Sequence, residues 1–207
     1  MALSRTMVSE GLLDELARFE ELVRPLTAAQ WDAPSRCQGW TVGDVARHVI
    51  GSMADVAAGQ LEGLGSPEVT QREVDERAGR SPAELADECL EATLAAAAML
   101  PLFDDAAWAG AGPGDFDGTL GDGVEALWYD TWMHAQDIRD ALGDAPVLSS
   151  SGFQGARSHI AWDLARIANW RGEMPKSDDA AYAFMLVATG RADASSVGAG
   201  APPNIYA

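Results

Sequence analysis

Apolar residues recur every three or four positions through most of the first 145 residues, which is the spacing of amphipathic helices. One such segment holds Leu12, Leu16, Phe19, Val23 and Leu26. Three more run from about residue 41 into the low 60s, from 81 to near 103, and from about 123 to 142. Four helices with connections of mixed length predict a four-helix bundle.

Local signals mark the ends of these helices. Thr41 is a good N-cap residue, and Asp44 stands three positions later, where a capping box places an acid or amide. Ser81 and Glu84 form a second pair of this kind. Gly143 takes the position at which a helix commonly ends in a left-handed residue. These signals agree with the helices that the apolar spacing predicts.

The remaining segments are shorter or less regular. Residues 70–79 predict a short polar helix, and the glycine-rich residues 104–123 predict a long loop. The G-x-G spacing in this loop favours a linker over a phosphate cradle, because no strand precedes it and it contains no lysine. A fifth periodic helix spans 153–167, a shorter apolar segment follows at 180–190, and the end is a loose tail or a wrapping arm. We expect an all-α chain, with a bundle over 1–147 and a helical extension and tail over 148–207.

Composition narrows the function. The net charge of −18 disfavours nucleic acid and anionic membrane surfaces as partners. No apolar run approaches the roughly 20 residues that span a bilayer, and acids within the N-terminal apolar stretch argue against a secretory signal. Two cysteines without CxxC spacing favour reduced thiols in a cytoplasmic protein over a disulfide scaffold or a cysteine-based zinc finger.

A histidine and a carboxylate lie within the apolar stripe of the fourth predicted helix. Asp130 and His134 are four residues apart and therefore share one face of that helix. His48 lies at the border of the apolar face of the second helix. A carboxylate directed into a bundle core needs a partner or a metal ion. Two imidazoles and a carboxylate on facing helices are a donor set for zinc or another divalent transition metal.

Simpler interpretations of these residues remain open. An inward histidine can be a hydrogen-bonded core residue, and Asp130 with His134 can be an ion pair. Asp137 could orient a ligand from behind or could be an exposed acid. Trp128 and Trp132 could pack in the core or could line a substrate pocket. His159 has no evident partner and is expected to be peripheral.

The residues that carry these features resemble a known family. The pattern W-x5-C-x-G-W-T-V-x-D-V-x-x-H runs from Trp31 to His48, and D-x3-H-x-x-D runs from Asp130 to Asp137. Together they resemble the mycothiol-dependent maleylpyruvate isomerase family of the DinB-like superfamily, over roughly residues 8–145. The family pattern has glutamate where this chain has Asp130, and residues after 148 look too short for the full second domain of the isomerases.

The resemblance implies a DinB-like bundle in which His48, Asp130 and His134 bind a divalent metal: zinc, or nickel or another transition metal. It also implies mycothiol, a low-molecular-weight thiol, as cosubstrate. A metal-bound thiolate could add to a small electrophile and then leave again, giving isomerisation, or stay attached, giving S-transfer. The alternative is a non-catalytic metal-binding module with a regulatory or structural role. Either protein is expected to be a monomer or a homodimer.

Overall fold

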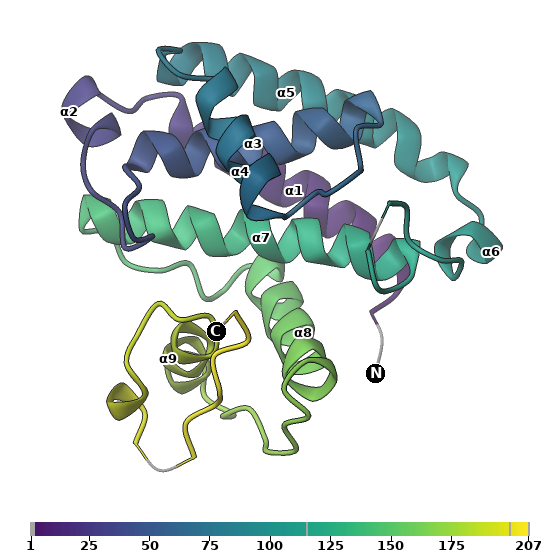
Figure 1. The fold of residues 1–207 in the computed structure, drawn as a ribbon, viewed down its shortest axis with the longest axis vertical. Coiled ribbons are helices and arrows are strands. Elements are labelled where there is room, and N and C mark those ends of the chain that lie inside the picture. Colours follow the sequence, from purple (N-terminus) through teal and green to yellow (C-terminus); the bar gives the residue numbers. More distant parts are fainter. Residues whose placement is uncertain (1–2, 115, 199, 207) are drawn as a thin grey trace.

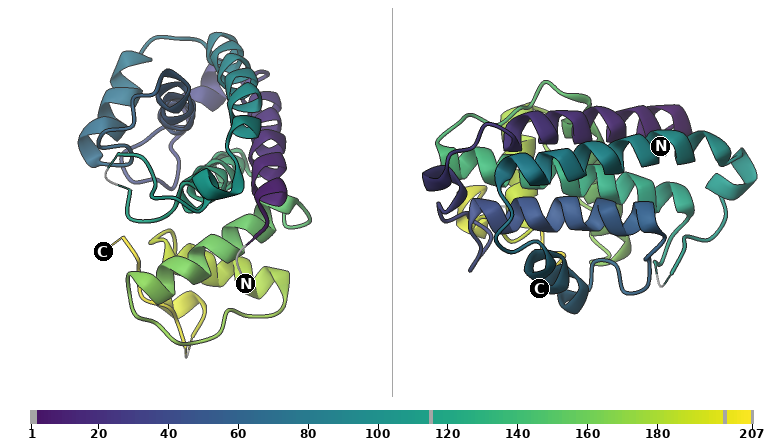
Figure 2. Two further views of the ribbon diagram at one scale, coloured as in Figure 1. Left: turned by 90° about the vertical axis from the view of Figure 1, so that its right-hand side faces the viewer. Right: turned by 90° about the horizontal axis from the view of Figure 1, so that it is seen from above.

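Four long helices pack around one core in the computed structural model, which describes residues 3–114, 116–198 and 200–206. They are α1 (Arg5–Val23), α3 (Val42–Ala58), α5 (Pro82–Met99) and α7 (Leu120–Leu142). α1 packs against α5 and α7, and α3 packs against the same two helices (Figures 1 and 2). This arrangement is the predicted four-helix bundle.

Capping explains where these helices begin and end. Thr41 and Asp44 form a capping box at the start of α3, and α3 ends at Ala58 because Gly59 adopts φ 72°. The sequence pattern extended α3 into the low 60s and was wrong there. α7 begins at Leu120, earlier than predicted, because Thr119 also caps it through a capping box.

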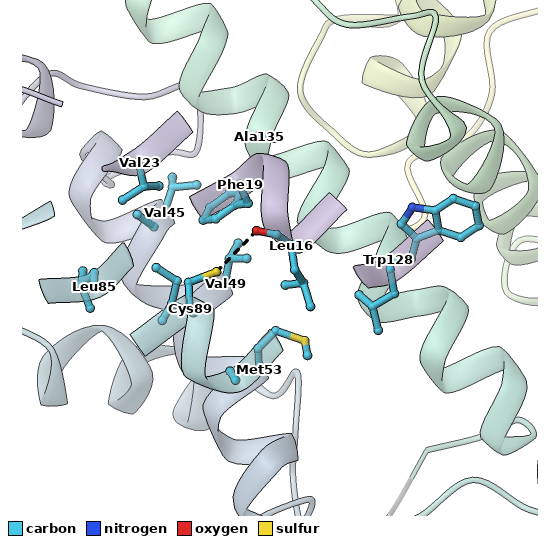
Figure 3. Close-up of a cluster of buried hydrophobic side chains, with 14 of the residues drawn as sticks. Leu16, Phe19, Val23, Val45, Val49, Met53, Leu85, Cys89, Trp128 and Ala135 are labelled. Carbon is cyan, nitrogen blue, oxygen red and sulfur yellow. Dashed lines mark hydrogen bonds between the residues drawn. The ribbon is translucent and has the colours of Figure 1, made fainter. Parts of the chain in front are cut away.

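The bundle core consists of large apolar side chains that the helical spacing placed on inner faces. Leu16 and Phe19 from α1 meet Val49 from α3 and Leu85 from α5 in a region with no solvent exposure or almost none (Figure 3). The buried Cys89 thiol donates to the Leu16 carbonyl at 3.7 Å. Burial of each large side chain stabilises the fold by roughly 1.5–3 kcal/mol.

Short helices occupy the connections of the bundle: α2 (Ala28–Trp31), α4 (Pro67–Glu76), the 3-10 turn η1 (Leu100–Leu102) and α6 (Asp105–Trp108). α4 is the predicted polar helix, and it packs against α3. α6 lies within the region that was predicted to be a long loop. The indole of Trp108 from α6 packs so closely on Gly121 that any side chain there would collide with it.

A second apolar cluster joins the C-terminal helices to the outer side of α7. α8 (Ser151–Arg166) packs on α7, and α9 (Asp178–Ala188) packs on α8 (Figure 1). Trp132, Phe153 and Phe184 are among the buried members of this cluster. After the 3-10 turn η2 (Ala194–Ser196), the chain returns so that buried Ile205 donates its N–H to the Ala188 carbonyl at 2.9 Å. The tail is therefore a wrapping arm.

Over the described ranges, the only β pairing consists of two isolated bridges. The predicted all-α fold is confirmed. Cys37 and Cys89 are both free thiols, as expected. None of the helices in the described part of the chain is long and apolar enough to cross a membrane.

Candidate metal centre

His48, Asp130 and His134 lie together where α3 packs on α7. The Nε2 atom of His48 lies 3.6 Å from Asp130 Oδ2, and the Nε2 atom of His134 lies 3.4 Å from Asp130 Oδ1. The two imidazole rings meet edge to face, with centroids 5.2 Å apart. One potential ligand atom from each residue lies within 4.8 Å of the other two. The helical spacing predicted that Asp130 and His134 share one face of α7. The packing of α3 against α7 brings His48 to the same place.

The ring of His48 is held from behind by a buried glutamate. Glu73 on α4 has no solvent exposure, and its Oε2 lies 2.7 Å from His48 Nδ1. Ser52 donates its hydroxyl to the same carboxylate at 3.1 Å. Gly51 makes this approach possible, because a Cβ there would lie 2.6 Å from the Cβ of Glu73. A carboxylate at Nδ1 favours a proton on that nitrogen, so Nε2, which faces Asp130, is the ring nitrogen available to a metal ion.

The ring of His134 is held in the same way by Asp137. His134 Nδ1 lies 2.8 Å from Asp137 Oδ2, and Asp137 is completely buried. Arg36 donates to Asp137 Oδ1 at 2.7 Å, and Arg191 donates to both carboxylate oxygens at 2.8–3.1 Å. The Cys37 thiol donates to Asp137 Oδ2 at 3.2 Å. Asp137 thus contacts the His134 ring on the side away from Asp130, and the alternative of an exposed acid is wrong.

The electrostatics of the cluster follow from this crowding. Burial would raise the pKa of Asp130, but the imidazoles of His134 and His48 outweigh burial and lower that pKa to about 2. Burial acts to lower the pKa of His134, yet Asp130 and Asp137 raise it well above its ordinary value. The cluster is therefore rich in negative charge and holds a proton at His134. A divalent cation would compete with that proton, because an imidazole must be neutral to bind a metal.

The donor set fits a divalent transition metal. Two Nε2 atoms and one carboxylate are ligands typical of zinc, and each imidazole has a carboxylate behind it, as metal-binding histidines usually do. The imidazoles are nearly buried, whereas the side chain of Asp130 is 34% exposed. The cluster therefore opens to solvent on the side of the carboxylate. Asp130 reaches both imidazoles despite being one methylene shorter than the glutamate of the family pattern.

A second group of possible ligands lies beside the first and fits a metal less well. Cys37, His134 and Asp137 also place ligand atoms within 4.8 Å of one another. The charge of Asp137 is already matched by the guanidinium groups of Arg36 and Arg191. A cation bound there would face two fixed positive charges. Among the described residues, no arginine forms an ion pair with His48, Asp130 or His134.

The structure decides one open alternative about neighbouring residues and corrects one prediction. Trp128 and Trp132 have no solvent exposure and belong to the two apolar cores, so neither presents a surface to a substrate. His159 is not peripheral. It is buried, its ring stacks on Tyr129 with centroids 4.7 Å apart, and its Nε2 lies 3.5 Å from Asp163.

Sequence reasoning did not identify Glu73, Arg36, Arg191 or Cys37. Glu73 is one of several acids in a polar helix, and only the packing of α4 on α3 sets it apart. Arg191 reaches Asp137 from 54 residues further along the chain. Cys37 is a specified position of the first family motif, which was the available signal for it, whereas Arg36 stands at an unspecified position of that motif.

Comparison with known proteins agrees with this architecture. Two crystal structures, of a mycothiol-dependent maleylpyruvate isomerase and of its histidine-to-alanine mutant, each superpose with a TM-score of 0.64 at 15% identity. The match covers 97% of this chain and 97% of each solved chain. The C-terminal part is therefore not too short for that fold, contrary to the sequence-based expectation. No curated protein sequence shows a significant match.

The family assignment rests on the match of this sequence to a family profile. A profile described as the mycothiol maleylpyruvate isomerase N-terminal domain matches residues 12–139, which is more than half of the chain. The matched range contains His48, Asp130 and His134 together with Glu73 and Asp137. The chain belongs to the mycothiol maleylpyruvate isomerase N-terminal domain family.

Proposed function

We propose that this protein is a thiol-dependent isomerase or S-transferase that acts on a small electrophile. In this proposal His48, Asp130 and His134 hold a divalent metal ion, with zinc as the best match to the donor set, and mycothiol is the thiol. The observation that carries the proposal is the orientation of the two imidazoles. Both Nε2 atoms face one partly exposed carboxylate, while each Nδ1 atom faces a buried acid.

A divalent ion at this centre would favour the thiolate form of a bound thiol at neutral pH. The protein's own residues would fix the geometry. Glu73 and Asp137 keep the two imidazoles in the tautomer that binds through Nε2, and Arg36 with Arg191 stops Asp137 from turning away. None of these groups has to react covalently.

The reaction class follows from thiolate chemistry. Addition of the sulfur to one end of a carbon–carbon double bond conjugated to a carbonyl moves the π electrons onto the carbonyl side. The resulting single bond can rotate, and loss of the same thiolate restores the double bond in the other geometry. If the electrophile carries a leaving group, the thiol stays attached and the reaction is an S-transfer.

We also propose that residues 1–147 and 148–207 are two structural units with one shared site. The first unit contains the bundle core and the proposed ligands. The second adds α8, α9 and the arm, and its Arg191 reaches back to Asp137 behind His134. This contact gives the C-terminal unit a direct role in positioning a ligand. Free thiols at Cys37 and Cys89 suit a reducing compartment such as the cytoplasm.

The competing hypothesis is a metal-binding module without catalytic activity. A module would need a closed centre, whereas 34% of the Asp130 side chain is exposed, which favours an open one. An assay distinguishes the two hypotheses. The metal-loaded protein, with mycothiol, should convert at least one member of a panel of unsaturated carbonyl compounds and halocarbons, and His134→Ala should not. Equal turnover by both proteins, or metal binding without turnover on the whole panel, would contradict the enzymatic proposal.

A further inference from the structure

A cleft lies on the other side of α7 from the candidate metal centre. It has a volume of about 480 Å³ and is bounded by α1, the C-terminal half of α7 and the connector that leads to α8. Arg139 lines this cleft and stands nine residues after Asp130. At about 100° per residue, nine residues place the two side chains on opposite faces of the helix. The size lies within the range of small-molecule sites.

One acidic side chain in the wall of this cleft is buried and leaves a carboxylate oxygen without a hydrogen-bond partner among the described residues. Glu15 on α1 is only 4% exposed, and its Oε2 atom has no hydrogen-bond partner among the described residues. A side chain at Gly152 of α8 would collide with this same oxygen, so the fold leaves room for the carboxyl group at that point. Burial raises the pKa of Glu15 to about 7, against the opposing influence of Arg18 and Arg139. An unpaired buried carboxyl group is costly unless it has a ligand to bind.

The same wall contains an arginine without an ionic partner. Within the described residues, every other arginine makes at least one side-chain hydrogen bond or ion pair, whereas Arg139 makes none, and its Nε atom is buried. This is unexpected in a chain with 32 acidic residues and 14 basic ones. A position in the last turn of α7 suits the helix dipole, but that interaction leaves the guanidinium hydrogen bonds unused.

We propose that this cleft binds a small zwitterion of the free amino acid class, with its ammonium group at Glu15 and its carboxylate at Arg139. Glu21 and Asp144 also line the cleft, so acids outnumber bases around it and a simple anion is disfavoured. Leu22 and Leu142 supply apolar wall for the carbon chain between the charged ends. The guanidinium plane of Arg139 suits bidentate binding of a carboxylate.

Calorimetric titration of the metal-loaded protein tests this proposal. The probes are glycine, β-alanine, glutamine and lysine, with acetate and methylammonium as controls that carry only one of the two charges. At least one zwitterion should bind saturably to each chain, and neither control should match it. Glu15→Gln and Arg139→Met should each weaken that binding by about tenfold or more, because each removes a charge-assisted hydrogen bond.

Two matched variants locate the site. Glu20→Gln makes the same acid-to-amide change on α1 outside the cleft lining, and His48→Ala alters only the candidate metal centre, so both should bind the zwitterion as the wild type does. Circular dichroism of each variant controls for folding. The proposal is overturned if no zwitterion binds, if acetate binds equally well, or if Glu15→Gln and Arg139→Met bind like the wild type.

Discussion

Replacement of Glu73 should weaken metal binding even though Glu73 is not a proposed ligand. Glu73 is completely buried, lies 2.7 Å from His48 Nδ1 and receives the Ser52 hydroxyl. Glu73→Gln keeps an oxygen that can accept from Nδ1 but removes the negative charge that makes the imidazole a better donor. Glu73→Ala removes both the charge and the acceptor, so the ring loses its fixed tautomer as well.

The expected magnitude follows from this difference. Loss of a carboxylate behind a metal-binding histidine typically lowers metal affinity by about 10- to 100-fold, or about 1.4–2.7 kcal/mol. We expect Glu73→Gln near the lower value and Glu73→Ala near the upper one. Competition titrations of the metal-free protein with Zn²⁺ and a chromophoric chelator measure both affinities.

A matched control separates this effect from a general loss of negative charge. Glu76 lies on the same helix, is about half exposed and pairs with Arg72 at 3.2 Å. Glu76→Gln should therefore bind Zn²⁺ like the wild type. If all three variants keep the wild-type affinity, His48 does not bind metal through Nε2 and the orientation argument fails. A loss in Glu76→Gln as large as that in Glu73→Gln would also refute it.

Three further predictions concern the proposed metal ligands and Glu15, the buried acid of the cleft between α1 and α7. His48→Ala and His134→Ala should purify with little metal, whereas His159→Ala should retain it, as elemental analysis would show; equal metal content in all three would exclude the proposed centre. Asp130→Asn should lose most of its metal and its thiol-dependent activity, and Asp130→Glu should keep the metal; an unchanged metal content in Asp130→Asn would limit Asp130 to an ion-pair role. Because burial raises the pKa of Glu15 from 4.5 to about 7, this group should contribute a loss of about 3 kcal/mol to the unfolding free energy of the wild type as pH rises through this interval. Urea unfolding of Glu15→Gln should show a much weaker dependence over the same interval, and an identical dependence would contradict the assignment.

The elements of the bundle could be predicted from the sequence because their signals are local. The apolar spacing of Leu12, Leu16 and Phe19 placed α1, and the pair Thr41 and Asp44 placed the start of α3. The main error was the start of α7, where glycines within the first turn concealed the capping box of Thr119. Gly121 leaves room for the Trp108 indole. This contact joins two separate helices, so the local sequence pattern does not reveal it.

The residues of the candidate site likewise fall into two groups: those that local spacing predicts and those that only the packing of separate helices reveals. Asp130, His134 and Asp137 lie on one helix, so their spacing of four and three residues indicated a shared face. Glu73 approaches His48 from 25 residues away, and it does so only because α4 packs on α3. The two tryptophans beside the ligands could not be assigned from spacing, since inward residues on α7 face either core or site. Because both tryptophan side chains are completely buried, the structure assigns them to the core.

Anomalous X-ray diffraction at the absorption edge of the bound metal tests the central claim most directly. Crystals of the zinc-loaded protein should give a single strong anomalous peak within bonding distance of His48 Nε2, His134 Nε2 and an Asp130 carboxylate oxygen. Zinc–nitrogen distances of about 2.0–2.1 Å are expected there. A peak among Cys37, His134 and Asp137 instead, or no peak near His48, would contradict the account.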